Sequence, residues 1–418
     1  MPTVVVDVVA MAALALLLAV AFVHPPGWVE AAVGLLAAGG VVAAGAVQWD
    51  GAVDQVRTLL PVVAFLAGVL VVAEVCAADG LFTAVGSLVS RASRGSPRRM
   101  LRLTFVAATL TTAVLSLDAT VVLLTPVVAA AATSTMTSPR PVVLACARLA
   151  NSASLVLPVS NLTNLLAVPS LPSVSFLGFA VRIAPAWLAV IGVEYVGHRI
   201  YFARDLSREP GAGEVGDDVR LPGVPLVVVA LMLLGFAALS PLGVQPAWVA
   251  GTAAVALSVH VLVHRRLPLV AVARATHLSF AVFVLCLGVV VAGLADTFLG
   301  KLVRSAIPGD TSLGSLLVVA LVATVLANLV NNLPATLLLI PLVAPAGVVA
   351  VLAAVIGLGV GSNLTYTGSL ANLLWRRTLV RGGGPALTRD FHVLSAMVTL
   401  PGVVVGVVVL WAWVPLVR

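Results

Sequence analysis

The chain has 418 residues, of which 61% are hydrophobic and only 9% are charged. An average soluble domain carries roughly 25% charged residues. The composition therefore excludes a soluble fold and predicts an all-α polytopic membrane protein surrounded by lipid. The formal net charge of +7 fits an excess of arginine in cytoplasmic loops better than nucleic-acid binding. Three scattered cysteines and no Cys/His cluster with metal-ligand spacing give no reason to expect a metal or another cofactor.

A membrane-spanning helix needs about 20 apolar residues, and ten stretches meet this requirement. They are predicted at 4–23, 29–47, 58–77, 141–169, 174–198, 222–241, 247–263, 276–295, 346–375 and 391–414. Two further apolar stretches, 103–132 and 312–345, are too long for one span and are interrupted by polar residues and proline. Each predicts a re-entrant hairpin, which is tolerated at membrane depth only within protein or beside a water-filled cavity. No lysine or arginine precedes the first apolar run, so a cleaved signal peptide is not expected.

The basic residues predict which loops lie in the cytoplasm. Seventeen of the 23 fall in one set of loops, which includes the Arg91–Arg102 cluster and the loop at 199–220, whereas Arg57, Lys301, Arg304 and Arg418 fall on the opposite side. Because cytoplasmic loops are enriched in lysine and arginine, this asymmetry places the 199–220 loop inside and, with ten spans, both termini outside. We expect a multi-pass protein of the inner (plasma) membrane.

The two halves of the chain resemble each other. Ser160-Asn161-Leu162-Thr163 recurs as Ser362-Asn363-Leu364-Thr365, and the spacing from Ser116 to Pro126 equals that from Asn331 to Pro341. The amphipathic arm before the first hairpin leads into the cytoplasmic arginines, whereas the second arm, at Lys301, falls outside. The pattern predicts two inverted repeats, a signature of secondary transporters. The first covers 1–200 (scaffold spans 1–90, hairpin 103–132, broken helix 141–169), a cytoplasmic linker covers 201–221, and the second repeat covers 222–418 (hairpin 312–345, broken helix 346–375).

Polar residues gather at four breaks in the apolar pattern, at the two hairpin tips and in the two broken helices. Unwound backbone at membrane depth offers carbonyls and helix N-termini to a ligand, and seven asparagines at or near such breaks favour a binding site over simple helix adhesion. The predicted substrate-binding residues are Ser116, Asp118, Thr120, Ser160, Asn161, Thr163, Asn331, Asn332, Ser362, Asn363 and Thr365.

Asp118 lies at the first predicted hairpin tip, where a carboxylate is costly and therefore a functional candidate. Its counterpart in the repeat is Leu333, so a single carboxylate would carry the exchanged proton, and Glu74 is the second candidate for proton coupling. Arg148, within a span, is expected to pair with Asp118 or Glu74. Three other acidic residues near span ends, Asp79, Glu194 and Asp296, are expected to be interfacial.

Several motifs together resemble the bacterial arsenite efflux permease family (ArsB type) of the ion transporter superfamily, which also includes divalent-anion/sodium symporters. They are Leu117-Asp118-Ala119-Thr120 with Leu124-Thr125-Pro126, Val159-Ser160-Asn161-Leu162, Val330-Asn331-Asn332-Leu333-Pro334 and the stretch from Thr367 to Trp375. The resemblance runs from about residue 58 to the end. It implies a scaffold plus a moving domain that carries both hairpins as an elevator, and efflux of arsenite or antimonite in exchange for protons. It leaves open a cytoplasmic ATPase partner and a homodimer.

Other functions remain open at this stage. A sodium-coupled carrier of small divalent anions would use unwound carbonyls for sodium and helix N-termini for the anion, and a sodium/proton antiporter would use Asp118. A non-transporting membrane scaffold would gain nothing from four polar breaks. An enzyme is not expected, because no nucleophile–base pair or metal motif is present in the sequence.

Overall fold

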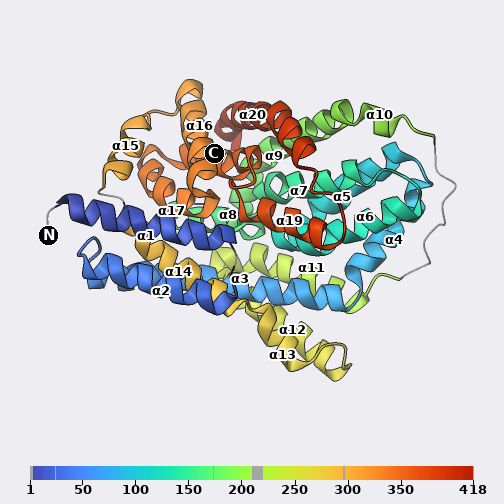
Figure 1. Ribbon diagram of the computed structural model, residues 1–418, viewed down its shortest axis with the longest axis horizontal. Coiled ribbons are helices and arrows are strands. Elements are labelled where there is room, and N and C mark those ends of the chain that lie inside the picture. The colour runs from blue at the N-terminus through green and yellow to red at the C-terminus, as the bar shows by residue number, and fades with distance from the viewer. Residues whose placement is uncertain (1–2, 24, 173, 210–219, 295–296, 418) are drawn as a thin grey trace.

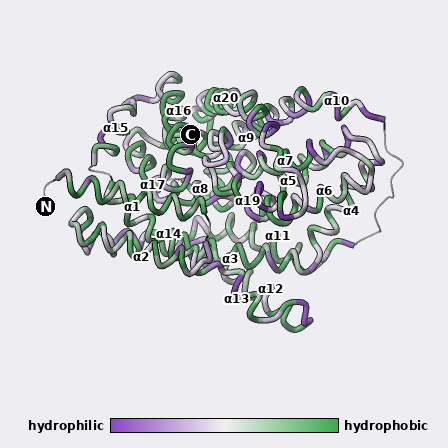
Figure 2. Tube along the Cα trace, viewed as in Figure 1, coloured by the Kyte–Doolittle hydropathy of each residue, from purple (hydrophilic) through white to green (hydrophobic). Residues whose placement is uncertain are grey.

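The computed structural model describes residues 3–417 apart from 24, 173, 210–219 and 295–296. Asp296 and most of the predicted linker at 201–221 therefore lie outside the described residues. The described part of the chain is helical and contains no strand. Figure 2 shows strongly apolar helices over most of the molecule, with hydrophilic stretches around α10 (Ala203–Leu206) and α15 (Phe298–Ala306) at opposite ends of its long axis. Leu36 and many other large apolar side chains are exposed on the outer helix faces, as expected where lipid covers them.

Eight helices of the described residues are long and apolar enough to cross a membrane. They correspond to seven of the ten predicted spans and to one hairpin arm, α16. The predicted span 29–47 is the shorter helix α2, and the predicted spans 141–169 and 346–375 are interrupted helices. The structure thus confirms a multi-pass helical membrane protein.

The helices form two layers, which Figure 1 shows one below the other. The lower layer, here called the scaffold layer, consists of α1 (Thr3–Val23), α2 (Gly27–Ala43), α3 (Trp49–Ala78), α11 (Gly223–Leu239), α12 (Pro246–Val263), α13 (Leu269–Ala275) and α14 (Leu278–Ala292). Within it α14 packs against α2 and α3, and α12 packs against α3.

The upper layer contains both hairpins and is here called the hairpin layer. Its first half consists of α5 (Pro97–Val114), a π-helical segment at Ala119–Leu124, α6 (Thr125–Ser134), α7 (Arg140–Ser152), α8 (Leu162–Ala167) and α9 (Phe176–Tyr201). Its second half consists of α16 (Leu313–Val330), α17 (Asn332–Val343), α18 (Val348–Gly359), α19 (Leu370–Arg381) and α20 (Thr388–Trp413). The pairs α9–α20, α16–α18 and α5–α7 make extensive contacts that hold the layer together.

Two connecting arms lie at opposite ends of the molecule. Helix α4 (Leu81–Ser93) follows α3, and α15 follows α14 at the equivalent point of the second half. Figure 1 shows α4 at one end of the long axis and α15 at the other. Each hairpin consequently enters the hairpin layer from a different end, and their tips can meet in the middle.

Candidate functional site

The two hairpin tips and the two helix breaks meet around a small cavity of about 60 Å³, here called the tip pocket. Its polar lining comes from the hairpin layer and consists of Ser116, Asp118, Ser160, Asn161, Asn332 and Ser369. On the scaffold side the pocket is covered by apolar side chains of α3 and by Phe280 of α14. The tip pocket therefore lies between the two layers.

The first hairpin turns at Ser116, where α5 has ended. The Ser116 hydroxyl accepts a hydrogen bond from the backbone N–H of Ala119 (3.2 Å) and so satisfies a donor at the start of the π-helical segment. The hydroxyls of Thr112 and Thr120 share a hydrogen bond of 2.7 Å inside the hairpin. Thr120 therefore holds the two arms together, whereas Asp118, directly before the π-helical segment, lines the cavity.

The second hairpin turns at Asn331, whose backbone has φ 72° and ψ 154°. This conformation strains a non-glycine residue by about 1–3 kcal/mol. The Asn331 side chain offsets that strain, because it accepts from the N–H of Leu333 (3.4 Å) and donates to the carbonyl of Thr367 (3.0 Å). The backbone N–H of Asn332 donates to the carbonyl of Gly368 (3.1 Å). Only glycine fits at position 368, because a Cβ on this residue would lie 2.3 Å from the carbonyl oxygen of Ser362.

The two broken helices repeat one hydrogen-bond pattern. The Asn164 amide donates to backbone carbonyls ten and seven residues before it, and so does the Asn372 amide. The helix after each break is capped by a side chain, Asn161 or Ser369, that accepts from the N–H two residues later. By this geometry the counterpart of Asn161 is Ser369. The repeated tetrapeptide instead predicts that Asn161 corresponds to Asn363, and the hydrogen bonds correct that alignment.

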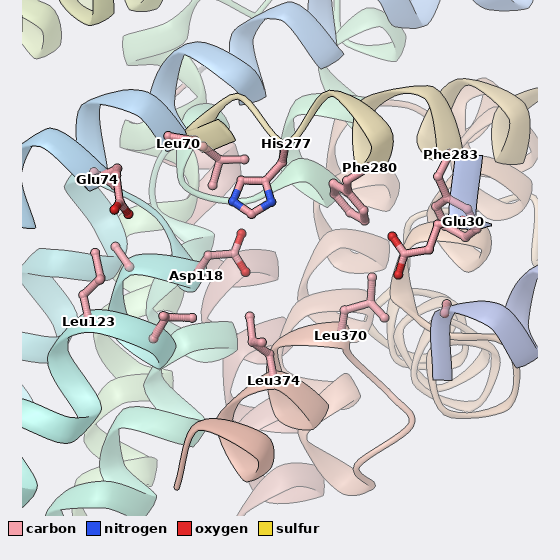
Figure 3. A pocket seen from close by; sticks show the side chains of 15 residues that line it. Glu30, Leu70, Glu74, Asp118, Leu123, His277, Phe280, Phe283, Leu370 and Leu374 are labelled. Atoms are coloured by element: carbon pink, nitrogen blue, oxygen red, sulfur yellow. The ribbon is translucent and has the colours of Figure 1, made fainter. Parts of the chain in front are cut away.

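A larger cavity of about 360 Å³, here called the vestibule, adjoins the tip pocket, since Asp118, Phe280 and Leu370 line both. Figure 3 shows its lining, which includes Glu30 of α2, Glu74 of α3 and His277, the residue between α13 and α14. The other lining residues are mostly apolar: Ala21, Leu70, Ala73, Ala119, Val122, Leu123, Ala275, Phe283 and Leu374. Two of the lining segments adjoin basic residues, since Arg274 precedes His277 and Arg376 follows Leu374.

A separate buried cluster surrounds Arg148, which has no solvent exposure. Its guanidinium pairs with both carboxylate oxygens of Glu194, at 2.7 and 2.9 Å, and donates to the hydroxyls of Ser395 and Thr399. The expected pairing of Arg148 with Asp118 or Glu74 is therefore wrong, and so is the interfacial placement of Glu194. The sequence could not reveal this pair, because its partners come from different helices.

The Arg148 cluster also includes one of the predicted site residues. The Asn363 amide donates to the Arg148 carbonyl and to Ser152, and its oxygen accepts from Asn151. These bonds tie the second broken helix to the first. Asp79, also expected to be interfacial, has its side chain 1% exposed and pairs with His260 (3.0 Å) and Arg266 (2.6 Å) in the scaffold layer.

The predicted site residues thus divide into two sets. Those that line a cavity are Ser116, Asp118, Ser160, Asn161 and Asn332 in the tip pocket and Glu74 in the vestibule. Those that line neither cavity are Thr120, Thr163, Asn331, Ser362, Asn363 and Thr365. Thr365, for example, bonds to the Asn328 side chain (2.8 Å), and the Ser362 hydroxyl donates to the Gly359 carbonyl (2.7 Å).

Sequence reasoning missed three polar residues that the structure brings to the cavities: Ser369, His277 and Glu30. A signal existed for the first two. Ser369 directly precedes an apolar helix, which is the position of an N-cap. His277 is a titratable residue at the very start of the predicted span 276–295.

The fold is helical and multi-pass, and a pocket with polar lining lies between its two layers. This arrangement is typical of a membrane transporter rather than an enzyme. A model of the CitMHS family, described as citrate transporter, matches residues 3–350. The chain belongs to this family.

Individual relatives and one solved structure agree with that assignment. The chain is 28% identical over 334 residues to proteins named "Arsenical pump membrane protein" from Escherichia coli (strain K12) and Shigella flexneri, covering 76% of this chain and 77% of each relative. A relative of the same name from Yersinia enterocolitica is 26% identical. The fold is similar to the crystal structure of the Alcanivorax borkumensis YdaH transporter, with a TM-score of 0.57, 18% identity and 87% of both chains covered. The family resemblance read from the motifs is thereby confirmed.

Proposed function

We propose that this protein exports arsenite, and by the same chemistry antimonite, across the inner membrane in exchange for protons. The observation that carries the proposal is the lining of the tip pocket, which combines hydroxyl and amide groups with a single carboxylate, Asp118. Among the described residues that line the two cavities there is no arginine or lysine. The relatives named as arsenical pumps support this choice of substrate.

The tip pocket suits arsenous acid, a neutral molecule in which arsenic(III) carries three hydroxyls. Its hydroxyls can donate to the Asp118 carboxylate, and its oxygens can accept from the side-chain hydroxyl and amide groups of the lining. The cavity of about 60 Å³ has room for roughly four to six water-sized groups. Citrate, with three carboxylates on a carbon chain, is too large and too negative for it.

The charge of the vestibule also favours a neutral substrate. Three carboxylates, Glu30, Glu74 and Asp118, line the vestibule, which adjoins the tip pocket. Like charges in a cavity with apolar walls repel an anion more strongly than they would in water. A neutral substrate avoids that cost, and a proton moving toward the cytoplasm meets groups that can accept it.

For the mechanism we propose inverted repeats and an elevator motion in which the hairpin layer moves against the scaffold layer. The matched hydrogen bonds of the two broken helices and the opposite positions of α4 and α15 support the repeats. In this arrangement the vestibule gives cytoplasmic access to the tip pocket. Impermeant labelling of single cysteines in intact cells tests the topology: a cysteine at Lys301 is expected to react, and cysteines at Arg98 and Arg204 are not.

A sodium-coupled carrier of a small anion is the second candidate. It is favoured by the helix N-termini of α17 and α19 at the tip pocket, since the positive end of a helix dipole attracts negative charge. The Asp118 carboxylate weighs against it, and so does the lack of arginine and lysine among the described lining residues. Sodium dependence of transport separates the two candidates.

The decisive experiment measures arsenite uptake into everted vesicles whose interior is acidic. We expect proton-driven accumulation in the wild type and none with Asp118→Asn, because the amide cannot carry a proton. Arsenite counterflow at uniform pH is expected to survive with about ten-fold weaker affinity, the loss of one charge-assisted hydrogen bond. Asp54→Asn, an exposed carboxylate outside both cavities, is the matched control.

Two outcomes would contradict the proposal. Accumulation by Asp118→Asn at the wild-type level would assign coupling elsewhere, with Glu74 tested next. Sodium-dependent uptake of a dicarboxylate without arsenite transport would favour the second candidate. Co-purification with the tagged chain tests the two protein partners that the resemblance leaves open, a cytoplasmic ATPase and a second copy.

A further inference from the structure

His277 occupies an unusual backbone position between the two layers. It separates α13 from α14 with φ 45° and ψ 46°, in the left-handed region that few non-glycine residues adopt. Its backbone is fixed on both sides, since its N–H donates to the Arg274 carbonyl and its carbonyl accepts from the Ala281 N–H, both at 3.1 Å. Figure 3 shows the imidazole ring directed into the vestibule, toward the Asp118 carboxylate. The strained turn thus aims a titratable side chain of the scaffold layer at the hairpin tip.

Several other charged groups surround this pair. Glu74 on α3 and Glu30 on α2 line the same vestibule, and Figure 3 shows both further from the imidazole than Asp118. Arg274, on α13, is exposed and is not among the residues that line the vestibule. Arg377 on α19 donates to the carbonyls of Phe22 and Val23 at the end of α1. The carboxylate that the imidazole faces is therefore that of Asp118.

The pair also joins the two layers. Asp118 belongs to the hairpin layer and His277 to the scaffold layer, so any sliding of one layer along the other separates them. His277 is exposed to the vestibule, and imidazole is the side chain whose charge changes between about pH 5 and 8. A group in this place can take a proton from Asp118 and pass it to cytoplasmic water.

We propose that His277 is the proton acceptor for Asp118 when the tip pocket faces the cytoplasm. The inference rests on the proposed proton exchange and adds the group that receives the proton from Asp118. The O–H bond of the protonated Asp118 carboxyl breaks, an N–H bond forms on the imidazole, and the imidazolium then releases the proton to water in the vestibule. The imidazolium also stabilises the Asp118 carboxylate while both face each other, and the motion that separates the layers removes this stabilisation.

The first test needs no substrate. Infrared spectroscopy of the purified full chain follows the carboxylic-acid C=O band during a pH titration, and Asp118→Asn identifies the band of Asp118. With His277→Gln the midpoint of this band is expected to rise by about one pH unit, a tenfold change in proton affinity. With His277→Lys, which keeps a positive charge, it is expected to stay at or below the wild-type value. His264→Gln, in the loop after α12, is the control and should leave the band unchanged.

Two results of this titration would overturn the inference. One is an Asp118 band that titrates identically in the wild type, His277→Gln and His277→Lys. The other is a shift confined to a band that Glu74→Gln removes. Thermal unfolding of each purified variant shows whether it is folded. If either the glutamine or the lysine variant does not fold, the other still tests the inference.

The second test measures transport. In proteoliposomes, His277→Gln is expected to lower proton-driven arsenite accumulation at least ten-fold, and to lower counterflow at uniform pH by less than three-fold. Equal losses in both assays would contradict a role in proton release. Absence of arsenite-linked proton movement in the wild type would instead overturn the proposed function, and the infrared titration would still decide whether His277 and Asp118 exchange charge.

Discussion

Two buried polar clusters in the hairpin layer differ in how their side chains are satisfied. Around Arg148, every guanidinium nitrogen has a partner, and Glu194, Ser152 and Asn363 complete the network. At the tip pocket, Asp118 and Asn332 line a cavity instead. Both clusters cost desolvation energy in a membrane, yet only the second has polar groups that line the tip pocket or the vestibule. Buried polarity alone therefore does not locate a transport site, whereas polarity that faces a cavity does.

The largest effect in this comparison is expected for Arg148→Met. Removing one partner of a buried ion pair leaves an uncompensated charge and costs about 3–5 kcal/mol, and here it also unties the two broken helices. We expect low abundance in the membrane and a strongly reduced unfolding temperature in detergent. The double variant Arg148→Met/Glu194→Leu should recover much of the lost stability, because no charge is left unpaired. A single variant of wild-type stability would contradict a structural role for the pair.

A smaller and different effect is expected for Asn332→Ala in the tip pocket. Its side chain lines the cavity, so its loss removes one ligand hydrogen bond, worth about 1 kcal/mol, and weakens arsenite binding roughly five- to ten-fold. Stability should stay near the wild type. Binding is measured with the purified protein, beside its unfolding temperature.

Asn331→Ala is the matched comparison at the neighbouring position. It removes the cap of α17 at a strained φ of 72°, which costs about 1–2 kcal/mol of stability. If both variants lost stability and neither lost affinity, the second hairpin tip would be structural. The substrate site would then lie elsewhere.

The sequence predicted the helical breaks well, because each break combines polar residues with proline or glycine in an apolar run. In the structure α5 ends at Val114 and α16 at Val330, and the helices that begin at Arg140 and Val348 end at Ser152 and Gly359. The sequence could not predict which polar residues at a break face the cavity. The tetrapeptide at Ser362 matches that at Ser160 in letters, but the helix of the second break begins later, at Leu370. The capping role consequently falls to Ser369, and only the three-dimensional hydrogen bonds reveal it.

Contacts between helices far apart in the chain also could not be predicted from the sequence. Arg148 and Glu194 meet because α7 packs on α9, and no local pattern encodes that pairing. His277 was missed for a related reason. Its significance comes from a left-handed turn in the scaffold layer that faces a hairpin tip far away in the chain.

The smallest effect is expected for Thr163→Val, at a predicted site residue that lines neither cavity. The Thr163 hydroxyl is fully buried and has no hydrogen-bond partner among the described residues, so its removal should leave stability unchanged or slightly higher. Arsenite transport is expected to stay within about two-fold of the wild type, with and without sodium. Thr120→Val is the control, since its hydroxyl is bonded to Thr112 and its loss should cost about 1 kcal/mol of stability without changing substrate affinity. Loss of transport in Thr163→Val, restored by raised sodium, would make this hydroxyl an ion ligand. That result would extend the functional cluster beyond the tip pocket and favour the sodium-coupled carrier over proton-driven export.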